Sequence, residues 1–318
     1  MSRINLVTSS AIVTLTLLPS SVLAQQGTLR QQLVGTWRMT SCDFKAPSCP
    51  GNGSFSFGGN GQYTEVILGR DRPKLTSAPG RGRGLALNNR AAVSAEEYKG
   101  IGQGTVAQFG TWSVDEASKT LTLHSENTFT RVNEGTDRKV SISLTGDELK
   151  VVVADGGSTT WKKSPPLQQV AQVAAVPAAA QQRTLKQQVQ GAWSLVSCDA
   201  KQPFCVNPTG SLSLNGNGRY TQVIAAKNRP TPALFVPGTH GENVTPEDFK
   251  AMARGVVANF GTWSVNEADK TLSTHSEEGL FPRPAGGGTG TKSTIVSVTA
   301  VEMRTTGPLG NAVYRRVK

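Results

Sequence analysis

Two segments of this chain, far apart in the sequence, are nearly the same. Residues 109–126 read FGTWSVDEASKTLTLHSE and residues 260–277 read FGTWSVNEADKTLSTHSE, so fourteen of the eighteen positions are identical. Further matches occur in the same order: 28–42 with 184–198, and 58–67 with 215–224. The offset between the copies stays between 151 and 157 residues. The pattern therefore indicates duplication of a whole domain, and 318 residues suffice for two domains.

Most of each copy shows the two-residue alternation of β-strands. GSFSF and QYTEVI flank an Asn-Gly pair at 60–61, and KVSIS and ELKVVV flank a Gly-Asp pair at 146–147. Such pairs favour tight turns, so both stretches predict hairpins. Each copy should have seven or eight antiparallel strands, and closure into a barrel removes the exposed sheet edges. We therefore expect an all-β chain with two tandem antiparallel barrels, each of which is filled by its own side chains or holds one small ligand.

One helix interrupts the strands of each copy. In the second copy Thr245 precedes a proline and is followed by Asp248, which is typical of a capped helix start, and the helical face is Phe249, Met252, Ala253, Val256 and Val257. In the first copy the helix starts at Ser94 and Glu97, and its glycines weaken it. Between the copies, residues 163–183 are rich in Pro, Ala and Gln and predict an extended linker.

The first 24 residues have the features of a secretory signal peptide. Arg3 is followed by an apolar run and a small-residue site that ends at Ala24. We therefore expect cleavage after Ala24, two barrels at 25–162 and 184–318, a periplasmic or secreted location in a bacterium, and no transmembrane segment in the mature chain. Loss of Arg3 changes the formal charge from +11 to +10. This basic charge allows contact with an anionic envelope surface, whereas scattered charges and export argue against nucleic acid as a partner.

Four cysteines occur as two pairs with the same spacing. Cys42 and Cys49 lie in SCDFKAPSC, and Cys198 and Cys205 lie in SCDAKQPFC. In an oxidising compartment this spacing predicts one local disulfide in each copy. A Cys-only metal site and crossed pairing between the copies are alternatives, although no histidine lies nearby to complete a metal site.

The ordered set of motifs resembles the bacterial lipocalin-like domain family. The set comprises LVGTWRMTS at 33–41, Asn-Gly-x-Tyr in the hairpin, Arg-Pro after it, and FGTWSVDE after the helix. A later His and a Leu-Phe-Pro element, 280–282 in copy 2, extend the resemblance over nearly all of both halves. The resemblance implies a barrel in which Trp37 and Trp193 close one end. By analogy with lipocalins, it also implies the binding of a small molecule.

Candidate ligand-binding residues are the aromatic and basic residues that both copies share. In copy 1 they are Tyr63, Arg72, Trp112 and Phe129, and in copy 2 they are Tyr220, Arg229, Trp263 and Phe281. The two arginines could bind a carboxylate or phosphate of the ligand. The pairs His124 and Glu126, and His275 and Glu277, each share one strand face and could be polar anchors in a cavity. Leu121 and Leu123 on the opposite face favour instead an outward position in copy 1.

Catalytic signals are weak in this sequence. We find no histidine pair with metal-ligand spacing, no Gly-x-Ser-x-Gly elbow and no Walker loop, so we expect no enzyme, no metal and no cofactor. The leading hypothesis is an exported protein whose barrels bind a small, largely apolar molecule that could carry an anionic group. The alternative is a structural or protein-interaction module of the cell envelope with filled barrels. An enzymatic role, such as cyclisation or isomerisation inside a barrel, is the third hypothesis, because it requires both His124 and His275 to face a cavity.

Overall fold

The computed structural model describes residues 27–73, 75, 93–153, 156–165, 183–231, 243–281 and 290–317. The expected signal peptide, most of the expected linker and Pro282 lie outside the described residues. Within the described part, no helix is long and apolar enough to cross a bilayer.

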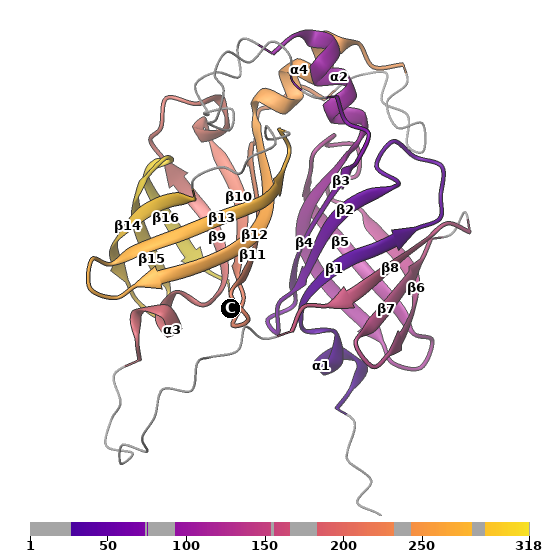
Figure 1. Cartoon of the computed structure of the whole chain (residues 1–318), viewed down its shortest axis with the longest axis horizontal. Coiled ribbons are helices and arrows are strands. Elements are labelled where there is room, and N and C mark those ends of the chain that lie inside the picture. The colour runs from indigo at the N-terminus through magenta and orange to yellow at the C-terminus, as the bar shows by residue number, and fades with distance from the viewer. Residues whose placement is uncertain are drawn as a thin grey trace, which may run out of the picture.

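The first copy forms a closed antiparallel barrel of eight strands in sequential order (Figure 1). Its strands are β1 (Gly35–Cys42), β2 (Gly51–Phe57), β3 (Gln62–Gly69), β4 (Thr105–Asp115), β5 (Thr120–Thr128), β6 (Asp137–Thr145), β7 (Glu148–Val152) and β8 (Ser158–Lys163). The barrel closes where β8 pairs with β1. The predicted hairpins, β2–β3 and β6–β7, are confirmed.

The second copy forms a closed barrel with the same strand order. Its strands are β9 (Gly191–Cys198), β10 (Pro208–Leu214), β11 (Arg219–Ala226), β12 (Val256–Asn266), β13 (Thr271–Gly279), β14 (Thr291–Val298), β15 (Glu302–Gly307) and β16 (Gly310–Arg316). The prediction of two tandem all-β barrels is confirmed. Below, barrel 1 contains β1–β8 and barrel 2 contains β9–β16.

A short helix covers one end of each barrel. These helices are α1 (Leu29–Leu33) and α3 (Leu185–Val189), and a threonine capping box starts each of them. The indole of Trp37 donates to the carbonyl of Leu33 at 2.8 Å, and that of Trp193 donates to Val189 at 2.6 Å. Both indoles are fully buried, so the tryptophans close this end of each barrel as expected.

The two longer helices lie beside each other, each at the end of its barrel that is opposite the short helix (Figure 1). Helix α2 (Ala95–Gln103) begins with the predicted capping box of Ser94 and Glu97, and Thr245 caps α4 (Pro246–Arg254). The predicted extent of the second helix is wrong, because α4 ends before Gly255 and Val256 already starts β12. A Cβ at Gly255 would lie only 2.8 Å from the side chain of Arg229, so glycine leaves room for that arginine where the helix passes into the strand.

The two barrels share a buried core, which the sequence did not indicate. Strands β2, β3 and β4 face β10, β11 and β12 across the contact. At its centre the hydroxyls of Ser54 and Thr221 are 2.7 Å apart, and those of Ser211 and Thr64 are also 2.7 Å apart. Thr221 is the repeat counterpart of Thr64, and Ser211 is that of Ser54. The two barrels are therefore related by an approximate twofold axis, like the subunits of a symmetric dimer.

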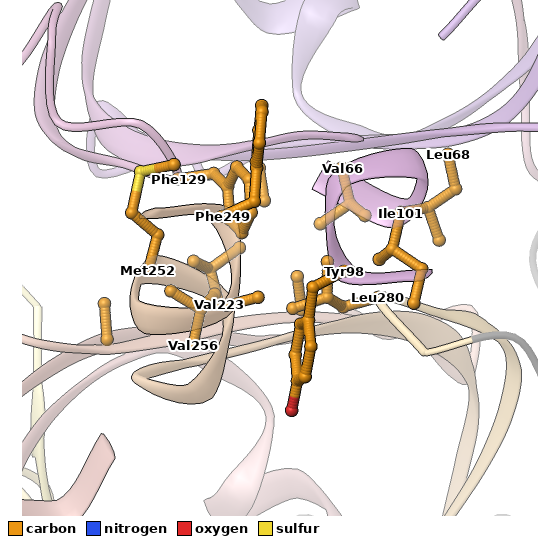
Figure 2. Close-up of a cluster of buried hydrophobic side chains, with 14 of the residues drawn as sticks. Val66, Leu68, Tyr98, Ile101, Phe129, Val223, Phe249, Met252, Val256 and Leu280 are labelled. Atoms are coloured by element: carbon orange, nitrogen blue, oxygen red, sulfur yellow. The ribbon is translucent and has the colours of Figure 1, made fainter. Parts of the chain in front are cut away.

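Apolar side chains from both barrels fill the contact between this centre and the two helices. Figure 2 shows Tyr98 and Ile101 of α2 and Phe249 and Met252 of α4 with strand residues such as Val66. The whole set is buried in one cluster. A contact this apolar resembles a permanent subunit interface rather than a transient one.

Candidate ligand-binding site

A cavity of about 720 Å³ lies at the mouth of barrel 1, at the end opposite α1. Its wall comes from inward side chains of β3 to β8, and its rim comes from the loops at 43–48, 129–133 and 156–157 and from the end of α2. The apolar side chains that line it are Phe44, Ile67, Val106, Ala107, Phe129, Val151 and Val153. The volume falls in the range typical of small-molecule sites.

A buried carboxylate lies in the polar part of this cavity. The side chain of Glu65 is only 4% exposed and accepts a hydrogen bond from Arg138 at 2.8 Å. The same oxygen, Oε2, also accepts from the amide of Gln108. Ser125 donates to the Gln108 carbonyl oxygen at 3.3 Å and lies 3.0 Å from the Tyr63 hydroxyl. These polar groups form one connected chain inside a largely apolar barrel, and such groups fix the orientation of a bound molecule.

Two of the predicted residues lie in the barrel interior, and one of them, Tyr63, is the end of this chain. Tyr63 and Trp112 belong to the buried core of barrel 1, where the Trp112 indole donates to the carbonyl of Gly58 at 3.1 Å. Burial raises the pKa of Tyr63 to about 12. Neither residue lines the described cavity. Tyr220 and Trp263 occupy the corresponding positions in the core of barrel 2.

Barrel 2 lacks the charged groups of this site. Gln222 is the counterpart of Glu65 by the repeat offset, and Asn259 is that of Gln108. The counterpart of Arg138 follows from the pairing of strands. Arg138 on β6 lies opposite Leu123 on β5, and Thr291 on β14 lies opposite Thr274, which is the counterpart of Leu123 on β13. Thr291 therefore replaces the arginine. At these three described positions, the carboxylate and the guanidinium occur together in barrel 1 and not in barrel 2.

The disulfide loop makes a second difference between the barrels. The predicted disulfides are confirmed: Cys42 is bonded to Cys49, and Cys198 is bonded to Cys205. The residue before the second cysteine is Ser48 in barrel 1, where it lines the cavity. In barrel 2 it is Phe204, in the short 3-10 helix η2 (Pro203–Cys205). Phe204 is fully buried in the core of barrel 2, so its ring occupies space that a serine leaves open.

A hydrogen-bonded carboxylate ties the disulfide loop of barrel 1 to strand β8. Asp43 accepts from the hydroxyl of Ser158 at 2.8 Å and also from its backbone N–H. Hydrogen bonds from Ser158 lower the pKa of Asp43. Asp43 also lines the cavity, so the disulfide and this carboxylate together hold the rim in place.

The structure places Arg72 and Arg229 between the barrels, not on a ligand. Arg72 of barrel 1 donates to the carbonyls of Gly279 and Leu280 in barrel 2, at 2.9 and 2.8 Å. Arg229 of barrel 2 donates to the carbonyl of Thr128 in barrel 1 at 2.7 Å. Burial lowers the pKa of each arginine to about 10, and both stay charged at neutral pH. Their predicted ligand role is therefore corrected to a role in joining the barrels, because a terminal nitrogen of each guanidinium donates to carbonyls of the other barrel.

The two predicted phenylalanines lie at the contact between the barrels. Phe129 belongs to the shared apolar cluster and also lines the cavity of barrel 1. Phe281 packs against Tyr98 of α2, with the ring centroids 5.7 Å apart. Of the eight predicted ligand residues, Phe129 alone lines the described cavity.

The histidines and glutamates of the His-Ser-Glu segments do not point into the barrels. His124 faces outward beside Asp137, at 2.8 Å, with 44% of its side chain exposed, and His275 is exposed. Glu126 is exposed as well, whereas Glu277 accepts from Arg219 at 2.5 and 2.8 Å and pairs with Arg38 of barrel 1. The expectation of polar anchors in the cavity is therefore wrong, because the alternation that turns leucines inward turns these side chains outward.

Sequence reasoning missed Glu65, Gln108 and Arg138. One available signal was the position of Glu65 in QYTEVI, where strand alternation puts it on the same face as Tyr63 and Ile67. A carboxylate among inward positions is costly unless it is paired, so it marks either an ion pair or a site.

Comparison with known proteins supports the barrel assignment. Residues 190–306 match the family model described as "Lipocalin-like domain". A solved structure, a protein with unknown function from the DUF3598 family of Nostoc punctiforme, is 9% identical and covers 91% of this chain and 97% of that chain. Its TM-score of 0.17 is too low to carry an argument. No curated protein matches the chain. The chain is thus a tandem pair of closed eight-stranded barrels, in which barrel 2 matches the lipocalin-like family model and barrel 1 is its repeat copy.

Proposed function

We propose that this chain is an exported protein that binds one small, largely apolar molecule in barrel 1. The observation that carries the proposal is the cavity of about 720 Å³ with Glu65, Gln108 and Arg138 in its wall. Pockets of this size, apolar with few convergent polar groups, are typical of small-molecule sites. The proposed mature chain comprises barrels at 25–162 and 184–318 joined by the linker at 163–183.

Barrel 2 has a structural role in this proposal. Phe204 and the indole of Trp193 belong to the same buried core, and the charged groups of barrel 1 are missing. Barrel 2 instead supports the mouth of barrel 1 from outside, since α4 packs on α2 and Arg229 binds the carbonyl of Thr128, which lines the cavity. The alternative hypothesis, in which a barrel is filled by its own side chains, therefore applies to barrel 2.

Export is supported by the cysteines as well as by the expected signal peptide. All four cysteines are paired in two local disulfides, which persist in oxidising compartments. The disulfide of barrel 1 closes the loop that lines the cavity mouth. An oxidising compartment therefore suits the proposed site as well as the fold.

A titration with a neutral fluorescent probe tests the proposal. N-Phenyl-1-naphthylamine, which fluoresces in apolar surroundings, should bind the intact chain with its disulfides formed. Ser48→Phe should weaken binding by about tenfold or more, because it introduces at the mouth of barrel 1 a ring like the one that Phe204 has in barrel 2. Each tenfold change in affinity corresponds to about 1.4 kcal/mol. Ala200→Phe adds a ring to the equivalent loop of barrel 2 and should leave the affinity unchanged. Absence of binding, or equal binding by wild type and Ser48→Phe, contradicts the proposal.

A further inference from the structure

We infer that the cavity of barrel 1 selects a ligand whose polar end is uncharged and carries a hydrogen-bond acceptor beside a donor. A carboxamide, a lactam or an undissociated acid has this chemistry, whereas a carboxylate or an ammonium group does not. The inference rests on the proposed function and replaces the sequence-based idea of an anionic ligand held by Arg72 or Arg229.

The first argument is the charge balance of the site. Glu65 and Arg138 form an ion pair at 2.8 Å, so together they carry no net charge. Glu65 is almost wholly buried, whereas 40% of the Arg138 side chain is exposed, so screening by water is weaker around the carboxylate than around the guanidinium. A ligand carboxylate at Arg138 would lie close to the carboxylate of Glu65, and a ligand ammonium at Glu65 would lie close to Arg138. Like charges at short range in a poorly screened site oppose both arrangements.

The second argument is the set of hydrogen-bonding atoms that remain open. Among the described residues, Nε of Arg138 is buried and has no hydrogen-bond partner. Both hydrogen bonds to Glu65 end on Oε2, so Oε1 has no donor within the described part of the chain. Arg138 donates to Glu65 through Nη2, and 40% of its side chain is exposed, so the ion pair offers further guanidinium N–H groups as donors and Oε1 as an acceptor. A neutral group with an acceptor and a donor pairs with both members of the ion pair at once, and a buried polar atom left without a partner is costly.

The third argument is the contrast between the two copies. Barrel 2 keeps the fold with Gln222, Asn259 and Thr291 at the three positions, so the fold itself does not require the ion pair. Buried ion pairs contribute little net stability compared with neutral residues of similar size. The pair is present in the barrel that has Ser48 at its mouth and absent from the barrel that has Phe204 there. Ligand recognition accounts for this coincidence, whereas a purely structural role does not.

Displacement of N-phenyl-1-naphthylamine from the intact protein tests the inference. Decanamide and decanoate share one chain length and differ in head-group charge at pH 8. Wild type should prefer decanamide to decanoate by about tenfold or more, since one uncompensated charge in such a site costs at least that factor. Glu65→Gln should reverse the preference, because Arg138 then lacks its counter-charge. Arg138→Gln leaves the carboxylate of Glu65 without a counter-charge and should shift the preference to decylammonium. The test therefore still holds if Glu65→Gln does not fold.

The outcomes separate the two proposals. If the probe does not bind wild type, the proposed function and this inference both fail. If the probe binds but decanoate displaces it as well as decanamide does, the inference alone is overturned. It is also overturned if neither compound displaces the probe, or if a folded charge variant keeps the wild-type preference. Preference for decanamide in wild type and reversal in Glu65→Gln together support it.

Discussion

Truncation of Arg229 tests whether the barrels are joined by buried charged groups. Its side chain is 1% exposed. Its guanidinium donates to the carbonyls of Thr128 and Ala226 at 2.7 and 2.9 Å and to the amide oxygen of Asn127 at 3.2 Å, and it pairs with Glu134 at 3.3 Å. Arg229→Ala removes all four contacts and leaves their acceptors without this donor.

The expected loss follows from these contacts. A buried acceptor that loses its donor costs about 1–3 kcal/mol, and breaking a buried ion pair costs about 3–5 kcal/mol. Glu134 is one-fifth exposed and the ion pair is long, so the carbonyl bonds carry most of the effect. We expect Arg229→Ala to lower the free energy of unfolding by about 3–5 kcal/mol in total. Arg72→Ala should have a similar effect, because Arg72 makes the equivalent bonds from the other barrel.

Urea denaturation followed by tryptophan fluorescence measures this loss. Arg304 is the control, because its ion pair with Glu302 is 2.7 Å long but lies on the surface, with 56% of the arginine side chain exposed. Exposed pairs contribute about 0–1 kcal/mol, so Arg304→Ala should change stability little. If Arg229→Ala costs no more than Arg304→Ala, the assignment of Arg229 as a structural contact between the barrels is refuted.

Three other perturbations follow from the same structure. Burial raises the pKa of Tyr63 to about 12, so the contribution of its protonated hydroxyl to stability is complete below about pH 10 and is lost as the pH rises towards 12. Over that range the melting temperature of Tyr63→Phe should therefore fall less steeply than that of wild type. Burial opposes ionisation of Glu277, but hydrogen bonds from two arginines outweigh this effect and lower its pKa below 4.5. The ionised carboxylate therefore stabilises the fold above that value, and this stabilisation is lost as the pH falls. A Glu277→Gln variant whose stability falls in acid as much as that of wild type would contradict this. A Cβ at Gly102 would overlap the ring of Phe249; Gly102→Ala should therefore cost up to about 2 kcal/mol in urea denaturation, and Phe249→Leu in the same chain should recover part of it.

The elements that sequence alone predicted are those with local causes. The Asn-Gly turn at 60–61 and the threonine cap at Thr245 act within a few residues, and both are present in the structure. The disulfides close short loops and needed no knowledge of the rest of the fold. The repeat then extended each local prediction to a second copy.

The contact between the barrels was not predicted because its residues resemble an exposed strand face. Ser54 and Thr64 alternate with inward aromatic residues, as solvent-facing residues of a barrel do. A weak signal existed in β3, where Val66 and Leu68 add apolar side chains to the outward face, so that the strand is buried on both faces. Arg72 and Arg229 were assigned to a ligand because sequence cannot distinguish a ligand oxygen from a carbonyl of another domain.

The site was predicted only in outline. Aromatic residues shared by the copies indicate what the fold needs, and Tyr63 and Trp112 indeed lie in its core. The polar groups of the cavity are instead those in which the copies differ, such as Glu65 and Ser48. Their proximity depends on the closing of the barrel across strands β3, β4 and β6, which no local pattern reveals.

The number of molecules bound per chain tests the account most directly. Native mass spectrometry of the intact, disulfide-bonded protein titrated with N-phenyl-1-naphthylamine counts them. Since barrel 1 combines the ion pair with a serine at its mouth, we expect one molecule per wild-type chain and a much lower bound fraction on Ser48→Phe at the same probe concentration. No bound molecule on wild type, two per chain, or wild-type occupancy on folded Ser48→Phe would contradict the account.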